Sequence, residues 1–134
     1  MTDALLAAVP EFNLRVPLEE FAPMWRAAER WYGVPIANPR NQGKVTGLVD
    51  VCRWLAGVTA VAPATGRPMR ATWETIEDEV SAIEACFSDI ERGAPPAWTL
   101  YPVGRADGVI IGFTWAWLAG ELPTHYFELT ADAR

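Results

Sequence analysis

The clearest pattern of apolar and polar positions lies in residues 69–92. Its large apolar residues follow one another at alternating steps of four and three: Met69, Trp73, Ile76, Val80, Ile83, Phe87 and Ile90. This spacing predicts a helix with one continuous apolar seam over three heptads, and Arg92 and Gly93 are typical of a helix end. We expect this helix to organise the fold and to bury Trp73, Ile76, Val80, Ile83 and Phe87 against residues 45–55 and 109–118.

The first third of the chain carries two weaker helical signals. Thr2 or Asp3 can cap a short helix over residues 4–9 that Pro10 ends. Residues 16–33 place Pro17 and Pro23 where first-turn prolines occur. They predict one broken helix, or a turn followed by a helix, with Gly33 as the C′ residue.

A further helix is expected over residues 38–57. Asn38 is a suitable N-cap, Pro39 fits the first helical position and Gly57 ends the segment. Apolar residues recur inside it at helical spacing: Val45, Leu48, Cys52 and Leu55. The connector over residues 58–68 is rich in Pro and Gly and is expected to form an ordered loop rather than a domain linker.

Residues 108–119 can be read in two ways. Large apolar residues alternate with smaller ones between Val109 and Trp117, as in a strand, and a hairpin over residues 97–117 would turn at the sequence GRADG. The helical alternative uses Asp107 as the cap and Gly120 as the C′ residue. Residues 54–57 and 117–120 both read WLAG, which we interpret as two helices that end in the same way, so we favour the helix.

These elements predict an all-α fold of about five helices with Pro/Gly-rich loops, in one domain over residues 1–134. The alternative is an α+β fold with the hairpin at residues 97–117. The composition, 51% hydrophobic and 21% charged, is that of a globular protein. The seven tryptophans indicate an aromatic core that extends to an interface.

The net charge and the cysteines restrict the expected cellular location and the expected classes of partner. The net charge of −6 argues against nucleic-acid binding and favours basic partners. No membrane interaction is expected, because the longest uncharged stretches, residues 54–66 and 108–120, are too short for a span, and the first ten residues do not resemble a signal peptide. The dispersed Cys52 and Cys86 indicate buried, reduced thiols and a cytoplasmic location.

No catalytic or metal-binding pattern stands out, so we expect no enzyme and no cofactor. His125 has Glu128 three residues on, but no nucleophile or pocket motif accompanies the pair. One histidine and two dispersed cysteines make a zinc site implausible. The sequence GRADG lacks the spacing and the lysine of a phosphate-binding loop.

The candidate partner-binding residues lie in two places. Glu77, Glu84 and Glu91, with Glu74 beside them, form an acidic stripe next to the apolar seam, which is either a solvated face or a face that docks a basic partner. Trp98 and Tyr101 lie in a Pro-rich loop and either form a recognition surface or fold back over the core.

The short WLAG helix ends beside Pro/Gly-rich connectors, in residues 48–57 and 113–120, resemble those of small proteins of actinobacteria and their phages. Ten Arg against the single Lys44 also suggest a GC-rich genome. The resemblance implies a source, actinobacteria or their phages, and it implies no activity. The leading hypothesis is therefore a non-catalytic helical interaction protein, from a phage or mobile element, that self-associates or binds a host or virion protein. The alternatives are a small-molecule binding domain with a Trp-lined apolar cavity and, more remotely, an enzyme that uses His125 with Glu128.

Overall fold

The computed structural model describes residues 3–93 and 104–120, and the described part of the chain contains helices and no strand. The α-helices are α1 (Asp3–Ala7), α2 (Leu18–Tyr32), α3 (Pro39–Leu55), α4 (Trp73–Glu91) and α5 (Arg105–Ala116), and a 3₁₀ turn, η1 (Glu11–Asn13), precedes α2. The all-α prediction is confirmed. The alternative hairpin is wrong for residues 105–116, because they form α5.

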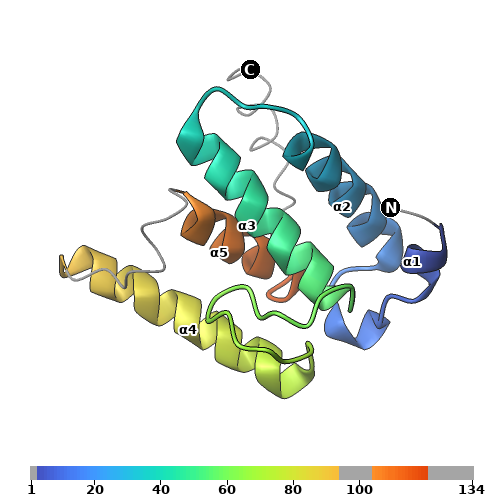
Figure 1. Cartoon of the computed structure of the whole chain (residues 1–134). Coiled ribbons are helices and arrows are strands. Elements are labelled where there is room, and N and C mark those ends of the chain that lie inside the picture. The colour runs from blue at the N-terminus through green and yellow to red at the C-terminus, as the bar shows by residue number, and fades with distance from the viewer. Residues whose placement is uncertain (1–2, 94–103, 121–134) are drawn as a thin grey trace.

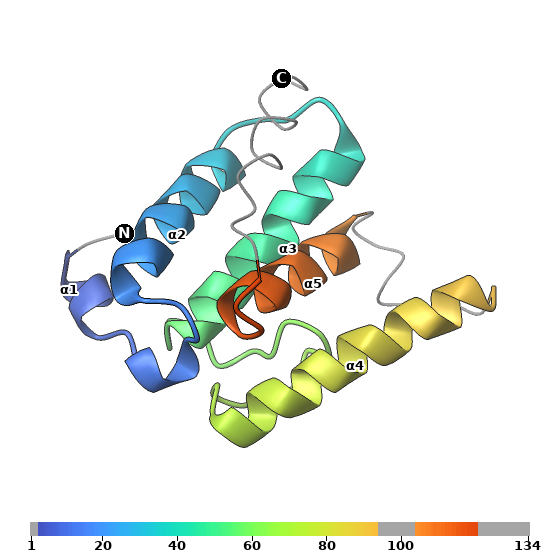
Figure 2. The ribbon, with the colours of Figure 1, turned by 180° about the vertical axis from the view of Figure 1, so that it is seen from behind.

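Helices α2 and α5 both pack on α3, and α4 lies below α5 (Figure 1). The chain returns along α4 after α3, so α5 runs in the same direction as α3. The view from behind shows η1 beside the N-terminal end of α4, close to where α5 ends (Figure 2). This end of the molecule therefore gathers segments that are far apart in the sequence.

Glycines on α5 allow its backbone to lie almost directly on that of α3. A Cβ atom built on Gly108 would overlap the carbonyl oxygen of Lys44, and one on Gly47 would lie 2.8 Å from the backbone nitrogen of Val109. Gly104 meets the backbone of Arg40 in the same way. Because Gly104, Gly108 and Gly112 are four residues apart, they share one face of α5. The closest helix contact in the fold thus depends on residues without side chains.

Aromatic rings fill the core around this contact. Phe21 of α2 stacks on Trp115 of α5 with centroids 5.7 Å apart, and Trp54 of α3 meets Phe113 edge-on at 6.2 Å. The indole N–H of Trp54 donates to the carbonyl of Met69 at 2.9 Å, and that of Trp115 donates to Glu20 at 3.4 Å. The rings are buried and their polar atoms have partners, as aromatic residues of a core require.

The predicted start of the long helix is wrong by four residues. Thr72 and Thr75 form reciprocal bonds in which the Thr72 hydroxyl accepts from the Thr75 N–H at 3.3 Å and the Thr75 hydroxyl accepts from the Thr72 N–H at 2.7 Å. This capping arrangement starts α4 at Trp73. Residues 69–71 stay outside the helix, and the carbonyls of Met69 and Ala71 accept from Trp54 and Asn13 instead.

The apolar seam of α4 is buried only in its middle. Ile76 and Ile83 are fully buried and Val80 nearly so, whereas Phe87 is half-buried and Trp73 is 61% exposed. The side chain of Ile90 is not among those described. Helix α4 packs on α5, while α3 and α5 share the main contact, so the prediction that residues 69–92 organise the fold is wrong. The glycine contact brings α3 and α5 closer than a seam of large side chains could.

Several predicted helix ends also differ. Helix α2 is unbroken, with Pro23 inside it on the exposed side, Pro17 as the N-cap, and Gly33 in right-handed geometry rather than as a left-handed C′ residue. Gly104, with φ 85°, precedes α5, so Asp107 lies within the first turn and is not the cap.

The two WLAG sequences do not end their helices in the same way. In α3, Gly57 has φ 81° and Val58 donates to the carbonyl of Arg53 at 2.9 Å, which is a Schellman end. After α5 the left-handed residue is Ala119, with φ 54°, and Gly120 donates to the carbonyl of Thr114 at 2.8 Å. The prediction that Gly120 is the left-handed C′ residue is therefore wrong.

Candidate partner-binding surface

Helix α4 presents an acidic face to solvent. The sequence of α4 contains seven carboxylates and no basic residue, and the predicted stripe residues Glu74, Glu77, Glu84 and Glu91 are all exposed. Asp78 adds a fifth exposed carboxylate beside them. Within the described residues, no lysine or arginine forms an ion pair with these five side chains. These five carboxylates can therefore interact with positively charged groups from outside the described residues.

The remaining two carboxylates of α4 have partners. Asp89 pairs with Arg92 just beyond the helix. Glu79 is 1% exposed and accepts from the N–H groups of Ala64 and Thr65 at 2.8 and 3.0 Å, and from the Thr65 hydroxyl at 2.8 Å. Glu79 thus holds the 58–68 connector on α4, which makes this connector the ordered loop that its composition predicted.

At the N-terminal end of α4, two tryptophans enclose an arginine. The guanidinium carbon of Arg15 lies 4.3 Å from the ring centroid of Trp73 and 3.9 Å from that of Trp117. The two rings meet nearly at right angles, at 79° with centroids 5.4 Å apart. Each cation–π contact contributes about 0.5–1 kcal/mol at an exposed site. We refer to Arg15, Trp73 and Trp117 as the aromatic–arginine cluster.

The backbone and a carboxylate fix the positions of these three side chains. The N–H of Arg15 donates to the carbonyl of Ala116 at 2.8 Å, which ties the segment after η1 to the end of α5. The indole N–H of Trp117 donates to Glu77 at 3.2 Å, so one acid of the predicted stripe orients a ring of the cluster. Trp117 is 4% exposed, whereas Trp73 and Arg15 are exposed.

Two exposed apolar side chains belong to the same chain segments as Arg15 and Trp117 of the aromatic–arginine cluster. Phe12 in η1 is 73% exposed and Leu118 after α5 is 52% exposed, and both belong to segments that meet the N-terminal end of α4 in Figure 2. Large apolar residues that are exposed at the same end of a molecule are typical of interaction sites. The docking surface is defined here as Phe12, Arg15, Trp73, Leu118 and the five exposed acids of α4.

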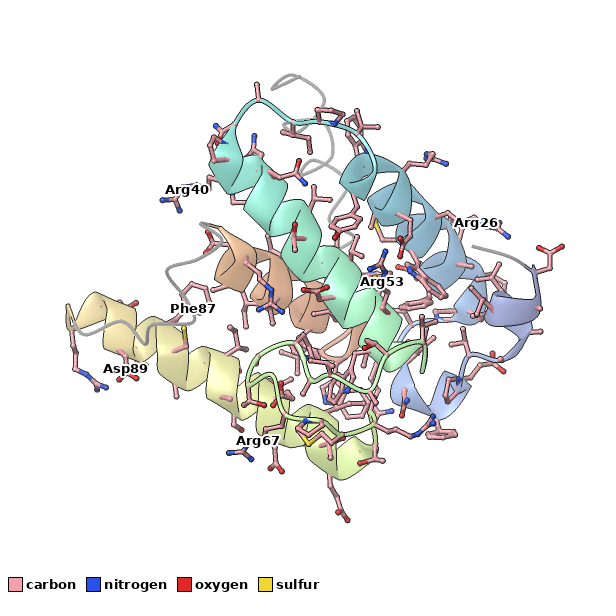
Figure 3. All side chains as sticks on the ribbon, viewed as in Figure 1. Arg26, Arg40, Arg53, Arg67, Phe87 and Asp89 are labelled. Atoms are coloured by element: carbon pink, nitrogen blue, oxygen red, sulfur yellow. The ribbon has the colours of Figure 1, made fainter. Side chains whose placement is uncertain are left out.

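A second charged cluster joins α2 to α3 and is structural. Arg53 points from α3 toward α2 (Figure 3) and binds Glu29 with two hydrogen bonds, at 2.8 and 2.7 Å. Trp25 donates to the same carboxylate at 3.0 Å. Burial acts to raise the pKa of Glu29, but the bonds from Arg53 and Trp25 outweigh it and hold the pKa below its ordinary value. The hydrogen bonds with Glu29 in turn raise the pKa of Arg53.

The sequence located the acidic face but not the cluster beside it. The heptad spacing predicts a buried Trp73, which is wrong because Trp73 is exposed, and no pattern in the sequence marks Arg15. The signal that could have corrected this is the Thr72 and Thr75 pair, which makes Trp73 the first helical residue and places it at the rim. Trp98, Tyr101, His125 and Glu128 lie outside the described residues.

The described residues offer no evidence for a metal site or a membrane span. No group of three or more His, Cys, Asp or Glu side chains in residues 3–93 and 104–120 could hold a metal ion. In that part of the chain no helix has both the length and the apolarity to cross a membrane. Cys52 and Cys86 are buried, as expected, and burial raises the pKa of Cys52 far above its usual range.

Comparisons with known proteins provide no relative for this chain. No family model, no curated protein and no solved structure matches it.

Proposed function

We propose that this protein is a non-catalytic interaction domain that docks a basic polypeptide on the docking surface. The observation that carries the proposal is the exposure of Trp73, 61%, at the N-terminal end of a helix whose charged residues are all acids. Tryptophan and arginine are the residues that most often dominate binding energy at protein interfaces. A tryptophan that stays exposed beside an arginine is thus better explained by an absent partner than by the core.

The charge of the surface selects the chemistry of that partner. The five exposed acids of α4 lack ion-pair partners among the described residues, and the whole chain carries a net charge of −6. A second copy would bring two acidic α4 faces together and would be repelled, whereas a basic polypeptide would be attracted and steered. Apolar side chains of the partner would cover Phe12, Trp73 and Leu118, and its basic side chains would face Glu74, Glu84 and Glu91.

The proposal is tested with synthetic peptides of equal length and equal apolar content but with positive, zero or negative net charge. Fluorescence anisotropy of the labelled peptides is measured with the full chain at about 50 and 150 mM salt. The cationic peptide is expected to bind, and its affinity to fall with salt. Equal binding of all three peptides, or no binding of any, would contradict the proposal.

Charge-neutral variants separate the acidic face from net charge in general. Glu84→Gln should weaken binding of the cationic peptide severalfold, while Glu19→Gln, which removes an exposed acid from α2, should not. Both changes should leave the free energy of unfolding within about 0.5 kcal/mol of the wild type. If the two variants lose the same affinity, the protein attracts the peptide only through its overall charge, and the α4 face has no docking role.

A further inference from the structure

We infer that Trp73 and Trp117 form a two-ring cage for a guanidinium group, that Arg15 is its built-in occupant, and that an arginine side chain of the docked partner takes the place of Arg15. This inference rests on the proposed function, because it specifies which side chain of the basic partner is recognised. The ligand class comes from the chain itself, since the cage already holds a guanidinium at 3.9 and 4.3 Å from the two ring centroids.

The cage has the geometry that recognises a cation. The guanidinium of Arg15 lies over the faces of two indole rings that stand at 79° to one another, and the negative face of each ring attracts this positive group. Glu77 accepts from the indole N–H of Trp117 at 3.2 Å, which fixes that ring and places a carboxylate at its edge. Trp73 remains 61% exposed, so one wall of the cage faces solvent.

Among the described residues, the contacts that hold the Arg15 side chain in the cage are its stacking on the two rings. Within residues 3–93 and 104–120, no carboxylate forms an ion pair with its guanidinium and no hydrogen bond from its side chain is present. The other arginines that join elements have carboxylate partners: Arg53 binds Glu29 and Arg105 binds Asp50 at 2.9 Å. An arginine without an acid is the easier one to displace.

The backbone of Arg15 does not depend on the side chain staying in the cage. Its N–H donates to the carbonyl of Ala116 at 2.8 Å, and the neighbouring Leu14 is buried in the core. The side chain can therefore leave while the segment stays in place. A partner that brings an arginine together with apolar contacts to Phe12 and Leu118 gains more binding free energy at this surface than the Arg15 side chain gains from the cage alone.

The test compares the wild-type chain with Arg15→Ala, in which the cage is empty. The probe is acetyl-Gly-Arg-Gly-amide, and its matched control contains citrulline, which has nearly the same shape but no charge. Binding is followed by nuclear magnetic resonance at the indole N–H signals, which Trp73→Phe and Trp117→Phe variants assign. Arg30→Ala removes an exposed arginine from α2 and serves as the control variant.

The arginine peptide should shift both indole signals of Arg15→Ala, and its dissociation constant should be about tenfold lower than with the wild type or Arg30→Ala, a difference of about 1.4 kcal/mol. The citrulline peptide should not bind, and adding Trp73→Ala to Arg15→Ala should abolish binding. Equal affinity for wild type and Arg15→Ala, equal binding of the citrulline peptide, or no saturable binding to Arg15→Ala would each overturn the inference.

Two further readings keep the outcomes distinct. If Arg15→Ala is unfolded by circular dichroism, Arg15→Gln keeps the aliphatic stem and is measured instead; unfolding of both variants shows that Arg15 is a structural clamp and overturns the cage. If the arginine peptide binds the cage but the charged peptides above do not bind the wild type, the proposed docking fails while the cage stands.

Discussion

Helix α5 contacts α3 through backbone, and it contacts α4 through large side chains. Gly108 lies against the carbonyl of Lys44 with no room for a methyl group, while on α4 the buried residues are Ile76, Val80 and Ile83. The first contact tolerates no added atom and is fully enclosed. The second leaves both ends of α4 partly exposed, including Trp73. The comparison places the tight backbone packing and the exposed Trp73 at two different contacts of α5.

The glycine contact should be the most sensitive part of the molecule. Gly108→Ala would place a methyl group on the backbone of Lys44, which cannot move as a side chain can, and the free energy of unfolding should fall by about 3 kcal/mol or more. The matched control is Gly33→Ala, because a Cβ atom there would have only ordinary contacts, the nearest at 3.6 Å. If urea unfolding gives the same midpoint for both variants, the close glycine contact between α3 and α5 does not determine the stability of the fold.

Truncation along the seam of α4 should show where that helix is buried. Ile83→Ala should cost about 3 kcal/mol, because the side chain is fully buried. Phe87→Ala should cost less, about 1–2 kcal/mol, although its side chain is larger, because Phe87 is only half-buried. Thermal and urea unfolding measure both values. A greater loss of unfolding free energy for Phe87→Ala than for Ile83→Ala would contradict this, and would support the continuous buried seam that the heptad spacing predicts.

The tie between α2 and α3 should depend on pH. Because the pKa of Glu29 is lowered on folding from its ordinary value of 4.5, the ion pair with Arg53 stabilises the fold above that value. The contribution is lost as pH falls through the lowered pKa. Wild type should therefore be more stable than Glu29→Gln by about 2 kcal/mol at pH 7. The difference should shrink below about pH 4.5, and a difference that stays constant down to about pH 2 would contradict the assignment.

The helices could be predicted because their signals are local. Asn38 and Pro39 start α3 where the cap rule places it, with the Asn38 side chain accepting from the N–H of Arg40 at 2.9 Å. The partner of each helix could not be predicted from apolar spacing, which is insensitive to backbone contacts. Gly104, Gly108 and Gly112 were visible in the sequence at intervals of four, but a glycine contributes nothing to an apolar seam.

The acidic face of α4 could also be predicted, since helical spacing alone places Glu77, Glu84 and Glu91 on one side. The aromatic–arginine cluster could not, because Arg15, Trp73 and Trp117 come from three segments that only tertiary packing brings together. Spacing also could not show that Glu79 is buried. Its burial depends on the loop N–H groups of Ala64 and Thr65 that it accepts from.

The most direct measurement is the pair of values for Trp73→Ala: its free energy of unfolding and its affinity for the cationic peptide. Trp73 is 61% exposed, whereas Trp54 is fully buried against Phe113. Trp54→Ala should thus unfold the chain, at a cost of about 3–5 kcal/mol. Trp73→Ala should cost no more than about 1 kcal/mol, yet lose binding of the cationic peptide by about tenfold or more. A Trp73→Ala variant that is as unstable as Trp54→Ala, or one that binds the peptide as tightly as the wild type, would contradict the account.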